Sequence, residues 1–331
     1  MKSARHGNLK LISGTNHPEM AQNLAKALNI KLADVTLGRF SDGEVKVDIN
    51  ENIRGSDLFL LQPTCPPVND SLMELLVLAD AARRASAARI TAVMPYFGYA
   101  RQDRKASPRA PISAKLVANM LTAAGVDRLL TIDLHASQVQ GFFDLPVDNL
   151  HAGAVLAGYI RQNLSQEPLT VVAPDVGGVA RAKSFARRLD APLAIIDKRR
   201  PAPNQAVVET LIGDIKGRTC LLLDDMVDTA GTLCSAAECL QKNGAKTVHA
   251  AATHGLLNSP ALERIEKSAI ETLWLTDTTP KPSKAQSSKI QTISIVPFLA
   301  EALRRVAQEE SIEELYQDFN VSLLDKARII A

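Results

Sequence analysis

Two neighbouring carboxylates stand at the start of segment 224–232, which also carries two threonine hydroxyls and a glycine. The apolar run 220–223 predicts a buried strand before it, and the pattern over 233–242 predicts a helix after it. Asp224 and Asp225 are suited to accept hydrogen bonds from sugar hydroxyls, or to hold a metal ion through water. Carboxylates at the end of a buried strand therefore indicate a polar ligand.

The second half of this segment is suited to a phosphate. A helix start presents unpaired backbone N–H groups and the positive end of the helix dipole. Thr229 and Thr232 add hydroxyl donors, and Gly231 allows the main chain to approach closely. The alternative is an ordinary strand-to-helix turn capped by Asp and Thr, which explains an adjacent acid pair poorly. We interpret the segment as a sugar-phosphate site.

A dense basic run, 101–105 together with Arg109, follows the turn residues 95–99. The fork-shaped donors of arginine suit a nucleotide polyphosphate, and Arg101 and Gln102 open the run. The alternatives are a solvated charge run or a nucleic-acid patch with the nearby aromatic residues. The position directly after a predicted strand favours a binding site.

The segment 39–44 combines an aromatic ring with two carboxylates around a glycine. A purine could stack on Phe40 while Asp42 or Glu44 accepts a hydrogen bond from its amino group, with Gly43 providing flexibility. A β-turn with Asp and Gly in their usual places explains the same residues equally well.

Two further acidic positions follow predicted strands. Asp133 is followed by His135, and Asp175 precedes a glycine pair and a predicted helix. Together, His135 and Asp175 could hold a divalent ion, with His135 acting through water because magnesium prefers oxygen ligands. The alternative for a lone histidine is a structural role.

The segment 197–201 places three consecutive cations before a proline. It follows a predicted strand at 193–196 and predicts a mobile loop rather than a helix. Such a loop, closing with Lys198 and Arg200 over phosphates, would exclude water and neutralise charge in a transition state. A solvated surface loop is the alternative.

Short apolar strands alternate with helical patterns along the chain, which predicts an α/β fold with mainly parallel, helix-covered sheets. Expected strands are 9–13, 58–62, 89–94, 129–132, 170–173, 193–196, 220–223, 247–253, 272–275 and 293–296. Expected helices are 17–28, 70–85, 113–124, 152–162, 178–189 and 300–308. Two similar domains, 1–149 and 150–310, would fit this pattern, with segment 311–331 packing back on the first.

The whole-chain composition is that of a globular protein. Its 331 residues are 46% hydrophobic and 22% charged, with a net charge of +2, so nothing global indicates nucleic acid or a membrane as partner. The four cysteines form no C-x-x-C pair, and no apolar stretch approaches the about 20 residues of a membrane span. No Walker P-loop is present. We expect a cytoplasmic protein.

Taken in order, these motifs resemble those of the class I ribose-phosphate diphosphokinases. The resemblance covers about residues 8–310 and rests on six motifs in the family order, at 39–44, 96–105, 133–135 with 140–143, 174–178, 195–203 and 224–232. It implies two phosphoribosyltransferase-like domains, a homohexamer or related oligomer, and transfer of the diphosphoryl group of MgATP to O1 of ribose 5-phosphate.

The resemblance also implies roles for individual residues. ATP would be bound by Phe40, Asp42, Gly43, Glu44, Arg101 and Gln102. Ribose 5-phosphate would be bound by Asp224, Asp225, Asp228, Thr229, Ala230, Gly231 and Thr232. His135 and Asp175 would be associated with magnesium, with manganese as the alternative ion, and Lys198 and Arg200 would stabilise the transition state.

The sequence departs from the family where Pro108 occupies a position usually held by a serine of the phosphate and ADP regulatory site, and in its C-terminal ending. Proline lacks both the hydroxyl and the N–H donor, so we expect altered phosphate activation and ADP inhibition. Two other functions compete. A phosphoribosyltransferase would leave the motifs of the first half unused, and a regulatory paralogue would not need the catalytic residues.

Overall fold

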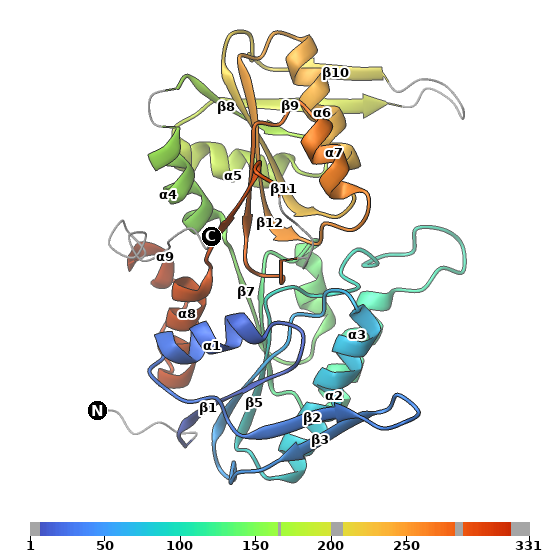
Figure 1. The fold of residues 1–331 in the computed structure, drawn as a ribbon, viewed down its shortest axis with the longest axis vertical. Coiled ribbons are helices and arrows are strands. Elements are labelled where there is room, and N and C mark those ends of the chain that lie inside the picture. The colour runs from blue at the N-terminus through green and yellow to red at the C-terminus, as the bar shows by residue number, and fades with distance from the viewer. Residues whose placement is uncertain (1–6, 165–166, 200–207, 282–286, 319–331) are drawn as a thin grey trace. The chain divides into compact units, whose positions relative to one another are not determined.

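The computed structural model describes residues 7–164, 167–199, 208–281 and 287–318. These residues divide into two compact units (Figure 1). The first comprises residues 7–151, 278–280 and 296–318, and the second comprises the remaining described residues, 152–277 and 281–295 with their gaps. Within the described part of the chain, no helix is long and apolar enough to cross a membrane.

The first unit is built on a parallel sheet in the order β1-β4-β5-β6-β7. Its strands are β1 (Leu9–Ser13), β4 (Asp57–Leu61), β5 (Arg89–Met94), β6 (Arg128–Ile132) and β7 (Val147–Leu150). Every residue of β4 is buried, so both faces of the sheet are covered, as parallel sheets require.

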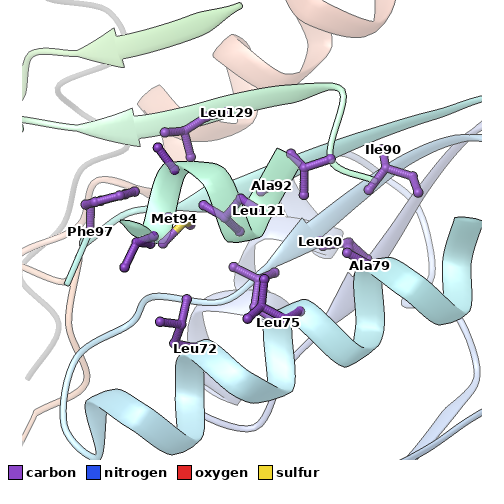
Figure 2. Close-up of a cluster of buried hydrophobic side chains, with 14 of the residues drawn as sticks. Leu60, Leu72, Leu75, Ala79, Ile90, Ala92, Met94, Phe97, Leu121 and Leu129 are labelled. Carbon is purple, nitrogen blue, oxygen red and sulfur yellow. The ribbon is translucent and has the colours of Figure 1, made fainter. Parts of the chain in front are cut away.

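Helices cover the two faces of this sheet. On one face lie α2 (Val68–Arg84) and α3 (Ser113–Ala124), and Figure 2 shows α2 directing Leu72, Leu75 and Ala79 towards the strands. Their spacing of three and four residues forms one apolar stripe on the helix. On the other face α1 (Pro18–Ala27) packs beside α8 (Val296–Gln308) (Figure 1).

Residues 296–318 complete the first unit. The sequence-based boundary placed 296–310 in the second domain, but α8 groups with the first unit, where Arg89 Nη2 donates to the carbonyl of Val306 at 3.0 Å. Arg89 also pairs with the buried Asp57. After α8, the short helix α9 (Leu315–Asp318) places the Tyr316 hydroxyl 2.8 Å from the backbone N–H of His151.

A separate antiparallel pair, β2 (Val35–Arg39) and β3 (Val45–Ile49), also belongs to the first unit. The expected strands did not include it. Two strands alone are marginally stable, and this hairpin is supported because alternate residues pack on the core under α2. These residues are Val35, Leu37, Val47 and Ile49.

The second unit carries a seven-stranded sheet in the order β10-β9-β8-β11-β12-β13-β14, parallel except for β10. Its strands are β8 (Leu169–Ala173), β9 (Leu193–Arg199), β10 (Val208–Ile212), β11 (Thr219–Val227), β12 (Thr247–Gly255), β13 (Thr272–Thr276) and β14 (Ile290–Ile293). The helices are α4 (Gly153–Asn163), α5 (Val179–Leu189), α6 (Gly231–Lys242) and α7 (Ala261–Lys267).

The prediction of an α/β fold with mainly parallel, helix-covered sheets is confirmed. The errors are misplaced element ends and elements that were not expected. The expected strand 293–296 is wrong, because β14 ends at Ile293 and α8 begins at Val296. A short 3-10 helix (Ser137–Phe142) and α7 were not expected.

Candidate functional site

The acid pair of the second unit lies inside a strand rather than in a turn. We expected the strand to end at Leu223, but β11 continues to Val227 because β12 runs alongside it, pairing Asp224 with Ala252 and Val227 with Gly255. Asp225 is 3% exposed, whereas Asp224 is partly exposed. The extended strand therefore fixes the backbone of both acids.

An arginine from the neighbouring helix faces this pair. Nη1 of Arg181, in α5, lies 3.1 Å from Oδ1 of Asp225 and 3.6 Å from Oδ1 of Asp224. The backbone N–H of Asp225 donates to Oδ1 of Asp224 at 2.8 Å. Burial, reinforced by the charge of Asp225, raises the pKa of Asp224 from 3.8 to about 7, and Arg181 opposes the rise. Asp224 therefore holds its proton to a higher pH than an ordinary aspartate does.

The turn after β11 leads directly into α6. Ala230 adopts a left-handed conformation (φ +58°) at the N-cap, and its side chain offers no hydrogen bond to the first-turn N–H groups. The first turn of α6 contains no acidic residue, and Thr229 and Thr232 are exposed beside it. A helix start without a side-chain cap suits an anion.

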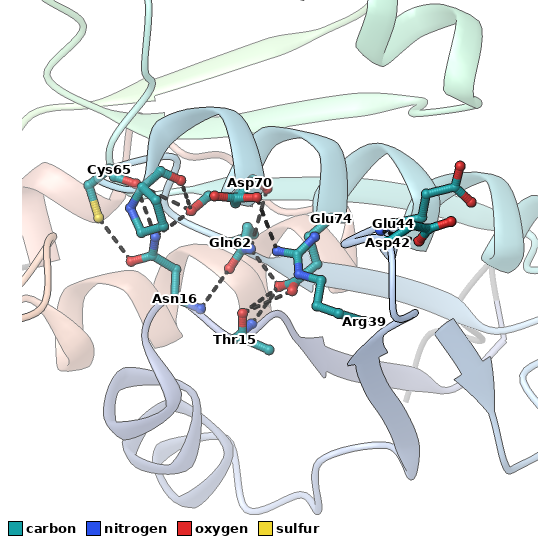
Figure 3. Close-up of polar contacts among 11 residues, drawn as sticks. Thr15, Asn16, Arg39, Asp42, Glu44, Gln62, Cys65, Asp70 and Glu74 are labelled. Atoms are coloured by element: carbon teal, nitrogen blue, oxygen red, sulfur yellow. Dashed lines mark hydrogen bonds and ion pairs between the residues drawn. The ribbon is translucent and has the colours of Figure 1, made fainter. Parts of the chain in front are cut away.

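The hairpin tip between β2 and β3 holds the expected adenine-binding residues of the first unit. The N–H of Phe40 donates to the carbonyl of Glu44 at 2.9 Å, and Gly43 turns the chain with φ +95°. The Phe40 ring is 52% exposed. Figure 3 shows Asp42 and Glu44 beside each other at the tip, with Arg39 directed instead to Asp70, 3.6 Å away. The tip is therefore a turn, as one interpretation of this segment predicted. It also exposes the aromatic ring that the adenine-binding interpretation requires.

The basic run lies between β5 and α3 in the first unit. Gln102 ties it to the fold, because its N–H donates to the carbonyl of Tyr99 and its carbonyl accepts from the N–H of Ala114. Arg101 and the side chain of Gln102 are exposed. The run is therefore anchored at its start and presents its cations to solvent.

The two expected metal residues belong to different units. In the first, Asp133 follows β6 with φ +42°, its Oδ1 lies 3.0 Å from Nδ1 of His151, and His135 is exposed. In the second, Asp175 follows β8, and its Oδ1 accepts from the N–H of Gly178 at 2.9 Å, ahead of α5. Among the described residues, no group of three or more His, Cys, Asp or Glu side chains could enclose a metal ion.

The cationic segment differs from the expected loop. The strand expected at 193–196 continues as β9 to Arg199, because β10 supplies an antiparallel partner that pairs Glu209 with Lys198. The backbone of Lys198 therefore lies in a strand, which corrects the prediction of a mobile loop at this residue. Arg200 lies outside the described residues.

Three polar residues that contact segment 224–232 were not found from the sequence: Arg181, Asn258 and Arg264. Arg181 looks like one more polar residue of an amphipathic helix. Asn258 and Arg264 follow the Leu-Leu pair after β12, and only their contacts to the turn before α6 distinguish them. The sequence offered one signal for Arg181. It is a basic residue early in the helix that follows Asp175, and that helix was expected to start at a binding site.

Known proteins resemble the chain over both units. A family model described as the N-terminal domain of ribose phosphate pyrophosphokinase matches residues 9–125, and one described as a phosphoribosyl synthetase-associated domain matches residues 201–317. The ribose-phosphate pyrophosphokinase of Clostridium perfringens is 52% identical over 313 residues, covering 94% of this chain and 98% of that protein.

Two further similarities agree. The ribose-phosphate pyrophosphokinase of Chromobacterium violaceum is 55% identical over 317 residues, covering 95% of this chain and 97% of that protein. The crystal structure of phosphoribosylpyrophosphate synthetase from Mycobacterium smegmatis has a TM-score of 0.88 at 43% identity, covering 91% of this chain and 99% of that chain.

Proposed function

The chain belongs to the ribose-phosphate pyrophosphokinase family, and we propose that it transfers the diphosphoryl group of ATP to O1 of ribose 5-phosphate. O1 attacks the β-phosphorus, so a new O–P bond forms while the bond from that phosphorus to the oxygen shared with the α-phosphorus breaks. The electron pair leaves with AMP, and the O1 hydroxyl loses its proton. The other product is 5-phosphoribosyl 1-diphosphate, for nucleotide biosynthesis.

The observation that carries this proposal is the arrangement of the end of β11 and the start of α6 in the second unit. The uncapped first turn of α6 would hold the 5-phosphate, and Asp228, Thr229, Ala230, Gly231 and Thr232 would bind ribose 5-phosphate. Asp224 would accept hydrogen bonds from the ribose hydroxyls, supported by the more deeply buried Asp225. Both ends of one small substrate would then be held.

ATP would be held by residues of the first unit. The half-exposed ring of Phe40 offers a stacking face, and Asp42 and Glu44 offer acceptors for the adenine amino group around Gly43. Arg101 and Gln102 would bind the polyphosphate. We include in this proposal a homohexamer or related assembly in which a neighbouring subunit completes the adenine site.

Phosphoryl-type transfer depends on positioning and on charge neutralisation. Magnesium, or manganese in its place, would supply charge neutralisation on the phosphates when bound. His135 and Asp175 would be associated with the ion, and magnesium needs few protein ligands because it keeps several waters. Lys198 and Arg200 would neutralise charge on the transferring group in the transition state.

The test is product identity. The purified protein is incubated with ATP, magnesium and ribose 5-phosphate, and nucleotides are separated by chromatography while phosphorus NMR follows the new diphosphate ester. We expect AMP in equal amount to the ester, and none when ribose 5-phosphate is omitted. ADP as the product would indicate an ordinary kinase. Binding without turnover would favour a regulatory paralogue, and both results would overturn the proposal.

A further inference from the structure

The turn before α6 is contacted by two side chains that do not belong to it. Both come from residues that follow β12 in the sequence. Nδ2 of Asn258 donates to Oδ1 of Asp228 at 2.8 Å, and Nη1 of Arg264, in α7, donates to the carbonyl of Thr229 at 3.0 Å. These contacts hold consecutive residues of the turn. One fixes a side chain and the other fixes the backbone.

The turn needs such support because its own conformation is unfavourable. Ala230 is held at φ +58° and ψ 9°, a region that residues with a Cβ rarely adopt, and it contributes no cap. Strained backbone persists only where the surroundings determine it. The contacts from Asn258 and Arg264 lie immediately before this residue and help to meet that requirement.

The guanidinium of Arg264 also lies close to the first residue of α6. A Cβ built on Gly231 would be 3.3 Å from its Nη1, so the guanidinium lies directly over the helix start. Arg264 lines an open cavity of about 550 Å³ between α6 and α7, together with Lys267, Glu263 and Ser235. Lys267 pairs with Glu263, one turn earlier in α7, and no contact to the turn is found for it among the described residues.

We propose that Asn258 and Arg264 are positioning residues, which hold the turn 228–230 in its substrate-binding conformation before ribose 5-phosphate arrives. The inference rests on the proposed function, since it assumes that this turn binds the sugar phosphate. An ordered turn binds its ligand without a further loss of conformational entropy. Removing either contact therefore weakens ribose 5-phosphate binding and leaves ATP binding unchanged.

The experiment compares Arg264→Gln, Asn258→Ala and the control Lys267→Gln, which removes a cation from the same helix and cavity. Steady-state kinetics give KM for each substrate, and calorimetry gives the affinity for ribose 5-phosphate without turnover. We expect KM for ribose 5-phosphate to rise about tenfold in Arg264→Gln and Asn258→Ala, with kcat and KM for ATP within about twofold of wild type. Arg264→Lys should recover part of the loss.

Two results would overturn the inference. One is an unchanged affinity for ribose 5-phosphate in both variants. The other is a parallel loss of affinity for both substrates together with a lower Tm, which would indicate a general structural role. Failure of the proposed function is distinguishable, because the wild-type protein would then make no AMP, while calorimetry would still compare the variants with the control.

Discussion

Nη1 of Arg181 lies 3.1 Å from Oδ1 of Asp225, which joins the first turn of α5 to the buried end of β11. The Asp225 side chain is only 4% exposed, whereas that of Arg181 is 30% exposed. The carboxylate therefore depends on this cation more than the cation depends on the carboxylate. The pair also brings positive charge to the side of Asp224.

Replacing Arg181 should destabilise the second unit. In Arg181→Gln the buried carboxylate of Asp225 loses its charged partner, and we expect the free energy of unfolding to fall by about 2 kcal/mol. Urea unfolding followed by circular dichroism measures the change. Arg188→Gln, an exposed residue of the same helix, is the control and should change stability by less than about 0.5 kcal/mol. Equal effects of the two variants would contradict the assignment.

Asp224 should make ribose 5-phosphate binding depend on pH. Its pKa is raised from 3.8 to about 7, mainly by burial, so the folded protein holds the carboxyl neutral below about pH 7 and ionised above it. The ionised form is the stronger acceptor of hydrogen bonds from hydroxyl groups, so affinity should increase as pH rises from about 6.5 to 8. Calorimetry across this range checks the result, and Asp224→Asn should flatten the dependence. The same slope in the variant would assign it to another group.

The pH dependence of stability should have the opposite sign to the pH dependence of ribose 5-phosphate binding. Because the folded-state pKa of Asp224 lies above its ordinary value, the proton is held more tightly in the folded protein. The contribution to stability is full below about pH 3.8 and is lost as pH rises to about 7. Asp224→Asn should lose this dependence in urea titrations over the same range.

A buried glutamate should stabilise the first unit through a polar network. Glu74 is 3% exposed and accepts from the Thr15 N–H at 2.6 Å and from Gln62 Nε2 at 2.7 Å (Figure 3). Glu74→Leu would leave both of these donors without their acceptor, and we expect a loss of about 2 kcal/mol in the free energy of unfolding. Asp80→Asn, which breaks an exposed pair in the same helix, should cost less than about 0.5 kcal/mol. Urea titration at neutral pH compares the two.

His249 should make the protein sensitive to mild acid. Its ring stacks on Trp274 at 5.3 Å between centroids, and its Nδ1 is buried with no hydrogen-bond partner among the residues that the structure describes. Burial lowers the pKa of His249 from 6.5, so the unfolded chain takes up a proton more readily. Stability should therefore decrease as pH falls below about 6.5. Thermal unfolding of His249→Phe between pH 5 and 7.5 should show a smaller decrease, and an unchanged profile would refute the assignment.

Lys198 should act on the transition state rather than on substrate binding. If it neutralises charge on the transferring group, Lys198→Ala should lower kcat by about 1,000-fold while the affinity for ribose 5-phosphate changes little. Single-turnover kinetics and calorimetry measure the two quantities separately. A variant that fails to fold, judged by circular dichroism, would show that the residue serves the strand β9 instead.

The sequence predicted element types well because apolar runs and amphipathic repeats are local patterns. It placed the ends of β9 and β11 too early, since Asp197 and Asp224 interrupt the apolar runs although their backbones still pair with neighbouring strands. Two ladders decide this, β10 with β9 and β12 with β11, and both partner strands lie later in the chain. Local patterns do not contain that information.

The candidate site was also predictable only where its residues form a local pattern. The segment 224–232 combines its residue types in consecutive positions, so it was visible without a structure. Arg181 approaches Asp225 only because β8 and β11 are adjacent in the sheet. Strand order is a property of the whole fold, and the partners that it supplies were therefore missed.

The place of α8 has a consequence for the order in which the chain can fold during synthesis. The carbonyl of Val306 that receives the Arg89 guanidinium lies 217 residues further along the chain, and α8 covers α1. A ribosome completes all strands of the first sheet long before it makes this helix. The side of α1 that contacts α8 must therefore wait uncovered while the second unit is translated, which is the interval in which a nascent chain is exposed to aggregation and to chaperones.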